Sequence, residues 1–228
     1  MIDKVLRREF SMGAVNKTTI KEQVYNVLKH KILHQQYQLG EKINIDALAT
    51  ELQVSNSPIR EALMLLARDG LIVTIPNNGA RVISFTEKSF VEIAQTLCAM
   101  LRGSYLLCVE LEKTREIVKC MEKHIALQHN ALNTHNFHEL VRQSILFDKS
   151  IISASENSYF LSIYERIEDV FYLMILHNNQ NGLQDCQKSI KEHEMILYNI
   201  RRNDVEQVLY WLSIHYDKHF EKKNPSVI

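Results

Sequence analysis

The chain has few of the residues that interrupt helices. Its 228 residues include six glycines and three prolines, and beyond residue 85 only Gly103, Gly182 and Pro225 occur. Because glycine and proline end or bend helices, a stretch of about 140 residues with so few of them predicts a run of helices. The composition changes near residues 83–87, and we place a domain boundary there.

Long apolar runs and paired cysteines are also missing. No segment approaches the roughly eighteen apolar residues of a transmembrane helix, and Met1–Met12 is charged where a signal peptide has an apolar core. Cys98, Cys108, Cys120 and Cys186 have neither the pair spacing of a zinc site nor the density of a disulfide scaffold. We expect reduced thiols, no membrane segment and a cytoplasmic protein.

The net charge of zero conceals a difference between the two parts of the chain. Residues 1–85 carry eleven Lys or Arg against eight Asp or Glu, and the rest carries sixteen against nineteen. A mildly basic N-terminal part and a mildly acidic C-terminal part fit an N-terminal nucleic-acid-binding module, although many enzymes show the same imbalance. The charge difference therefore does not distinguish a nucleic-acid-binding protein from an enzyme, and the sequence motifs must do so.

Residues 55–70 predict a short helix with two different faces. Ser55 suits the N-cap, Pro58 is tolerated in the first turn, and Gly70 is a usual stop. One face is apolar, at helical spacing: Ile59, Ala62, Leu63 and Leu66. The other face is polar: Asn56, Ser57, Arg60 and Arg68. Such a face suits the major groove of DNA; the alternative is an ordinary amphipathic helix with a solvated face.

The neighbouring elements favour the DNA-binding interpretation. We expect helices over residues 18–36 and 45–52 before this helix. After it, a β-branched strand over 71–75, a turn over 76–79 and a strand over 80–83 predict a hairpin. Three helices followed directly by a β-hairpin form a winged helix-turn-helix, and this order is more specific than any single element. Residues 1–16 show no sustained period, and we expect a flexible arm.

Beyond residue 85 the periodicity predicts about six helices. Their expected bounds are 86–110, 112–132, 135–154, 157–178, 182–201 and 203–222. Connections this short require antiparallel neighbours, which indicates an up-and-down bundle. The fold class is therefore mainly α, with a winged helix-turn-helix followed by an all-α antiparallel bundle.

Two histidines of the last helical hairpin lie at nearly the same depth. His193 precedes the expected turn at Asn203 by ten residues and His215 follows it by twelve. At 1.5 Å per residue, these separations are roughly 15 Å and 18 Å along the two helices. Both imidazoles can face one interior cavity and bind a divalent transition metal. The alternative is that the two are level by chance, one in the core and one exposed.

Both parts of the chain resemble known families. Over about residues 18–83 the sequence is similar to the DNA-binding domain of GntR-type bacterial transcriptional regulators, through Tyr37–Glu41, Asp46–Ala49, Val54–Leu63 and Asp69–Ile72. The helical part resembles the FCD-type effector-binding domain of the FadR subfamily, through Phe147-Asp148, Ala154–Asn157, Glu192-His193, Ile196, Ile200, Asp204 and His215. The resemblance implies a DNA-binding domain over 17–84 and an effector-binding and dimerisation domain over 85–228.

For the DNA-binding domain, the resemblance implies a homodimer that reads an inverted repeat in double-stranded DNA, with one helix in each major groove. The candidate contacts are Ser55, Asn56, Ser57, Arg60, Arg68, Asn78, Gly79 and Arg81. Arg60 is the candidate for a guanine, because an arginine can donate to both acceptors of that base. Asn56 stands where the family usually has a second arginine, which predicts an operator that differs from the usual half-site.

For the helical domain, the resemblance implies a metal held by an aspartate and a histidine one turn apart and by two later histidines. His193 and His215 match the later pair, including its separation of 22 residues. At the earlier pair the sequence departs from the family, because Ser144 replaces the aspartate and Asp148 replaces the histidine. Asp148, His193 and His215 still form a set that suits Zn²⁺, Ni²⁺, Mn²⁺ or Fe²⁺. Alternatively, Asp148 orients a histidine without touching the metal.

Arg102 lies where FCD proteins often carry an arginine that faces the cavity. There it would bind the carboxylate of a small organic acid, with Ser144 adding a hydroxyl. The alternatives are an arginine that reaches solvent from an apolar helix or one at the dimer interface.

Taken together, the motifs and the resemblance predict a ligand-responsive repressor that is not an enzyme. The other hypotheses are a metal-sensing regulator, a metal-dependent helical-bundle enzyme, and a regulator without metal whose effector is an apolar ligand such as an acyl thioester.

Overall fold

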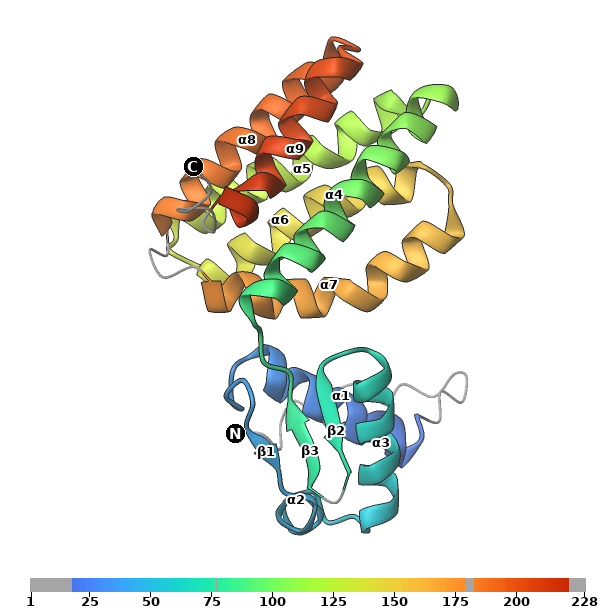
Figure 1. Ribbon diagram of the computed structural model, residues 1–228, viewed down its shortest axis with the longest axis vertical. Coiled ribbons are helices and arrows are strands. Elements are labelled where there is room, and N and C mark those ends of the chain that lie inside the picture. Colours follow the sequence, from blue (N-terminus) through green and yellow to red (C-terminus); the bar gives the residue numbers. More distant parts are fainter. Residues whose placement is uncertain (1–17, 77, 179–182, 222–228) are drawn as a thin grey trace, which may run out of the picture.

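The computed structural model describes residues 18–76, 78–178 and 183–221, which form a winged helix and a helical bundle (Figure 1). The expected arm over 1–16, Asn77 of the hairpin turn and the break at 179–182 lie outside the described residues. The elements of the winged helix are α1 (Ile20–Leu33), β1 (Lys42–Ile43), α2 (Ile45–Leu52), α3 (Asn56–Arg68), β2 (Ile72–Ile75) and β3 (Gly79–Val82). Those of the bundle are α4 (Glu87–Glu110), α5 (Thr114–Asn133), α6 (Phe137–Ala154), α7 (Ser158–Asn178), α8 (Leu183–Arg201) and α9 (Val205–Glu221).

The winged helix contains the predicted three helices and hairpin, together with a strand that the sequence did not reveal. β2 and β3 pair antiparallel, with Ile72 opposite Val82, and β1 pairs with the other edge of β3 to give the order β1-β3-β2. β1 has only two residues, Lys42 exposed and Ile43 buried, which is too short to display an alternating pattern. It extends the wing to three strands.

α3 buries the predicted apolar stripe, since Ile59, Ala62, Leu63 and Leu66 are all buried. Ser55 is the N-cap residue and its backbone is extended, but its side chain makes no capping hydrogen bond, contrary to our expectation. At the other end Gly70 adopts a φ of +76°, a left-handed conformation that glycine reaches without steric cost. α3 is therefore held by its buried face and by the turn that follows it.

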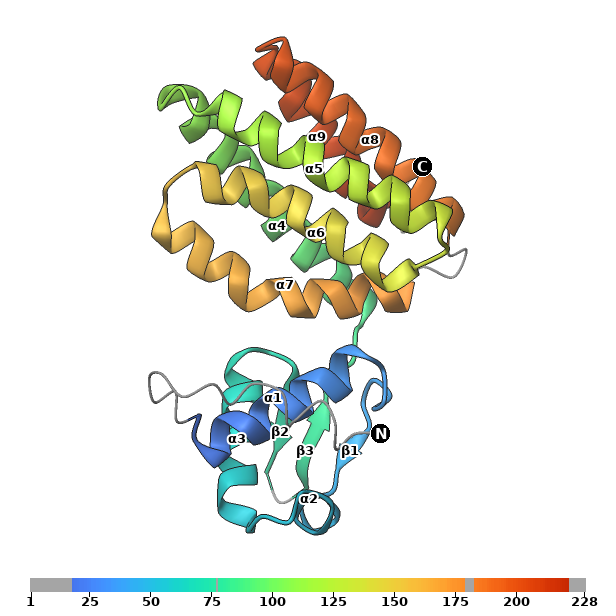
Figure 2. The same cartoon turned by 180° about the vertical axis from the view of Figure 1, so that it is seen from behind.

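The bundle confirms the predicted helices, although its packing is not strictly sequential. α5 lies between α6 and α8, whereas α4 packs against α6, α7 and α9 (Figures 1 and 2). Among the described residues, no helix is both long and apolar enough to cross a membrane. None of the four cysteines forms a disulfide, and Cys120 is exposed.

Within the described residues, four sharp turns after bundle helices form without glycine. Glu112, His135, Glu156 and Asn203 each adopt a φ of 53–57° just after a helix. After α4, the N–H of Lys113 donates to the carbonyl of Cys108 at 2.8 Å, the six-residue bond that closes a helix end. Comparable bonds follow α5 and α8. A sequence with few glycines therefore still supports a tightly connected bundle.

α7 connects the bundle to the winged helix. In both views it is the bundle helix drawn closest to the winged helix (Figures 1 and 2). Val170 and Leu173 of α7 are buried in the winged-helix core, while Tyr164 and Met174 of the same helix belong to the bundle core. Nearby, Lys29 of α1 forms an ion pair of 2.5 Å with Asp169. α7 thus contributes side chains to both hydrophobic cores.

Gly70→Ala should destabilise the protein. The new Cβ would lie 3.3 Å from Cγ2 of Val170, and φ is +76°, so we expect the free energy of unfolding to fall by about 1–2 kcal/mol. Gly103→Ala in α4 is the matched control, because its Cβ would meet Phe160 at an ordinary 3.8 Å and alanine favours helix. Urea unfolding should move the two variants in opposite directions; a similar shift in both would contradict this account.

Candidate metal centre and DNA-reading surface

Three of the predicted site residues lie together inside the bundle. Asp148 of α6, His193 of α8 and His215 of α9 each offer a ligand atom, and these atoms all lie within 4.8 Å of one another. Asp148 and His193 are fully buried, and His215 is largely buried. The Nε2 atoms of the two histidines are 3.3 Å apart. The antiparallel hairpin therefore places both rings at one depth, as their spacing predicts.

Hydrogen bonds orient both imidazole rings. Nδ1 of His193 lies 2.9 Å from Oε1 of Gln128, whose amide nitrogen donates to the carbonyl of Gln143. Nδ1 of His215 lies 2.9 Å from a carboxylate oxygen of Glu192. Because both partners are oxygens that accept, each Nδ1 carries the proton, and each Nε2 of a neutral ring carries a lone pair. Two lone pairs that face each other at this distance suit a bound cation.

The carboxylate of Asp148 completes the cluster. The hydroxyl of Tyr216 donates to Oδ2 at 2.7 Å, whereas the buried Oδ1 has no hydrogen-bond partner in the described structure. Burial raises the pKa of Asp148 to about 7, although the bond from Tyr216 opposes this shift. A cation would supply the missing partner and favour the charged form. Two imidazole nitrogens and one carboxylate oxygen are a ligand set that fits a divalent transition metal.

The two predicted effector residues make their contacts elsewhere. The guanidinium of Arg102 donates to the carbonyl of Leu209 at 2.9 Å and to the hydroxyl of Ser213, so that it joins α4 to α9. The hydroxyl of Ser144 donates to the carbonyl of Leu140 within α6 at 3.1 Å. Among the described contacts, neither side chain bonds to a residue of the Asp148, His193 and His215 cluster. Their role in ligand binding stays a prediction.

The orienting roles of Glu192, Tyr216 and Gln128 were not predicted from the sequence. Glu192 and Tyr216 are the sequence neighbours of His193 and His215, but adjacent residues of a helix point about 100° apart. Neither side chain bonds to the histidine beside it in these contacts: Glu192 accepts from His215, and Tyr216 donates to Asp148. Gln128 on α5 stands in no motif that the sequence displays. Only the packing of α5 against α8 shows its role.

The polar face of α3 is exposed as predicted. Arg60 lies on this face and forms no ion pair in the described structure. Asn56 donates from its amide to Asp46 of α2 at 3.0 Å, and Ser57 donates to Glu61 at 3.4 Å. Arg68, near the end of the helix, bonds to Asp69 at 3.2 Å. These exposed contacts are weak, so the side chains can exchange them for contacts with DNA.

The wing presents the other predicted DNA contacts. Asn78 and Gly79 are exposed at the hairpin turn, and Lys42 of β1 donates to Asn78 at 3.3 Å. Arg81 is half-buried, and its guanidinium donates to the carbonyl of Gly40 at 3.0 Å. Lys42 is a cation that the sequence did not single out, because its strand was not expected. It lies at the same end of the wing as Asn78.

A winged helix with an exposed polar helix, followed by an α-helical bundle, is the architecture of a DNA-binding regulator. The family described as bacterial regulatory proteins, gntR family, matches residues 20–82, and the FCD domain matches residues 99–218. The chain belongs to the GntR family of bacterial regulatory proteins and carries an FCD domain. It is a transcriptional regulator rather than an enzyme.

The chain is similar to other regulators over most of its length. It is 27% identical over 196 residues to the HTH-type transcriptional regulator YdhC of Bacillus subtilis, covering 86% of this chain and 87% of that protein. It is 26% identical to the gluconate operon transcriptional repressor of the same organism, covering 89% and 84%. A GntR regulator from Rhodococcus sp. RHA1 has a TM-score of 0.73 at 14% identity, covering 92% of this chain and all of that one. E. coli McbR/YncC has a TM-score of 0.69 at 18% identity, covering 91% and 100%.

Asp148→Asn should alter how the stability of the metal-free protein depends on pH. The folded-state pKa of about 7 exceeds the ordinary 3.8, so the native state binds the proton more tightly than the unfolded chain does. The free energy of unfolding should therefore fall between about pH 4 and pH 7, by up to about 4 kcal/mol, and this loss should be absent from the variant.

Urea unfolding with a chelator at pH 5 and pH 8 measures this effect. Glu206→Gln, at the exposed start of α9, is the control and should keep the wild-type dependence. If Asp148→Asn also kept it, Asp148 would not be the buried acid of this site.

Proposed function

We propose that this protein is a transcriptional repressor of the FadR subfamily that acts in the cytoplasm as a homodimer on an inverted repeat. In this proposal a small organic acid, bound in the FCD domain together with a divalent metal, controls the affinity for the operator. The cluster of Asp148, His193 and His215, with its two facing Nε2 atoms, is the observation that supports metal-linked control.

DNA recognition is assigned to α3 and the wing. Arg60 extends from the exposed face of α3, so an insertion of this helix into a major groove would bring its guanidinium to the base edges. Ser55, Ser57 and the first N–H groups of α3 would hold a phosphate at the positive end of the helix. Arg81, Asn78 and Gly79 would place the wing against the adjacent backbone.

The bundle cluster would hold the metal and the effector. A divalent cation bound by Asp148, His193 and His215 would leave coordination positions open for carboxylate oxygens of a ligand. Gln128 and Glu192 keep Nε2 of each ring directed into the site, because they accept the Nδ1 protons. Two relatives are gluconate operon repressors, and gluconate is a small organic acid, which supports this class of effector.

In this proposal α7 links the metal cluster to the DNA-binding domain. Lys149, next to Asp148 on α6, forms ion pairs with Glu165 and Glu168 of α7. The following residue, Asp169, binds Lys29 of α1. A change at α6 would therefore move the helix that contacts the winged helix. Control requires that the effector bind the two arrangements of the dimer with different affinity.

Arg60→Ala should remove specific operator binding and leave the fold intact, because Arg60 is exposed. We expect a loss of about 10- to 100-fold in affinity for the operator, with little change for unrelated DNA. Fluorescence anisotropy with both DNAs measures the ratio. Lys88→Ala, an exposed lysine at the start of α4, should preserve that ratio. Full operator discrimination by the Arg60 variant would show that another residue reads the bases.

Asn56 should contribute its own base preference. An asparagine can pair with both groups of an adenine edge, whereas the arginine usual in the family prefers guanine. We expect selection from random DNA to return different bases for the wild type and for Asn56→Arg at one position of each half-site. The same bases from both proteins would refute this role for Asn56.

Titration with metal and organic acid tests the control mechanism. Operator affinity should respond to gluconate or another small carboxylate only when Zn²⁺ or Ni²⁺ is present, and Asp148→Asn should weaken this response because it removes a ligand. If the metal alone switches binding, the protein is a metal sensor. If an acyl thioester acts without metal, the metal-linked proposal is wrong.

A further inference from the structure

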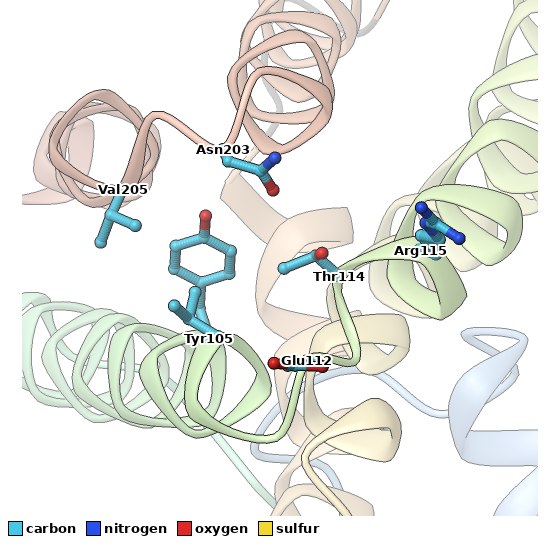
Figure 3. A pocket seen from close by; sticks show the side chains of 7 residues that line it. Tyr105, Glu112, Thr114, Arg115, Asn203 and Val205 are labelled. Carbon is cyan, nitrogen blue, oxygen red and sulfur yellow. The ribbon is translucent and has the colours of Figure 1, made fainter.

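A hollow lies at the end of the bundle, where the turn between α4 and α5 meets the turn between α8 and α9 (Figure 3). Its volume is about 540 Å³, within the range of sites for small molecules. The residues that line it belong to α4, α5, α9 and the two turns, and they include neither Arg102 nor any residue of the metal cluster. It is therefore a separate candidate site.

Tyr105 supplies the observation that points to a ligand. Its side chain is fully buried, and its hydroxyl has no hydrogen-bond partner within the described structure. Figure 3 shows this hydroxyl directed toward Asn203 across the hollow. Burial raises the pKa of Tyr105 to about 12, so the hydroxyl remains a donor at neutral pH. A buried donor without a partner is costly, and an acceptor atom of a ligand would relieve that cost.

Groups of opposite charge lie on different sides of the hollow. Arg115 stands beside Thr114, which begins α5, so that the guanidinium and the positive end of the helix favour an anionic group. Glu112 lies on another side and favours a cationic group (Figure 3). Neither Arg115 nor Glu112 forms an ion pair within the part of the chain that the structure describes.

The remaining wall is apolar. Val109 of α4 and Val205 of α9 line the hollow, and both are half-buried. A ligand with one anionic group, one cationic group and a short apolar chain would match all three kinds of wall. The carboxamide of Asn203 can donate to or accept from such a ligand.

We propose that this hollow binds a small zwitterion with an apolar side chain, of the α-amino acid class, as a second ligand site independent of the metal cluster. The carboxylate faces Arg115 and the start of α5, and one of its oxygens accepts from the hydroxyl of Tyr105. The ammonium group faces Glu112. The site does not depend on DNA binding or on the proposed organic-acid effector.

Calorimetry on the full-length protein with L-leucine tests the charge requirement. Isoamylamine lacks its carboxylate and isocaproate lacks its ammonium group, so each should bind at least about tenfold more weakly than leucine. Binding of leucine should persist in a chelator and in Asp148→Asn. The absence of leucine binding at concentrations up to about 10 mM, or its loss with the metal, would overturn the proposal.

Tyr105→Phe separates a ligand-binding role from a structural one. Removal of a hydroxyl that has no partner should leave the melting temperature unchanged or raised, yet weaken leucine binding by about five- to tenfold. Arg115→Gln should weaken binding by about tenfold, whereas Lys119→Gln, one turn further along α5 and exposed, should have no effect. Leucine binding that is unaffected by both Tyr105→Phe and Arg115→Gln would place the ligand elsewhere.

Discussion

Val170 and Leu173 lie in the hydrophobic core of the winged helix, although their helix, α7, belongs to the bundle. Each is almost fully buried, and complete burial of such a side chain contributes about 1.5–3 kcal/mol. The neighbouring ion pair of Lys29 with Asp169 is partly exposed and contributes at most about 1 kcal/mol. The apolar contact therefore determines how the DNA-binding domain sits on the bundle, and the ion pair adds orientation.

The same helix packs against α6, which carries Asp148. A buried acid beside two facing imidazole nitrogens is unfavourable without a cation, because Oδ1 has no partner and burial raises the pKa of the acid. A bound metal in the middle of the bundle would give Oδ1 a partner and favour the charged form of Asp148. α7 is the element through which such a change would reach α1 and α3.

Much of this arrangement could be predicted from local patterns. The apolar stripe of α3 and the scarcity of glycine predicted helices whose bounds agree with the structure to within about three residues. The level positions of His193 and His215 followed from helix geometry. β1 was missed because two residues show no period, and the bond from Gln128 to His193 depends on tertiary packing. The bonds from Arg102 to α9 also depend on tertiary packing, and its expected role in the effector cavity stays a prediction.

Hydrogen exchange of the metal-free and Zn²⁺-loaded protein tests whether the cluster is linked to the DNA-binding domain, because it follows each helix separately. Metal should increase protection in α6, α8 and α9, where the ligands lie, and should also change it in α7 and in α1 around Lys29. Protection that changed only in the three ligand-bearing helices, with α7 and α1 unaffected, would contradict a link between the cluster and the DNA-binding domain.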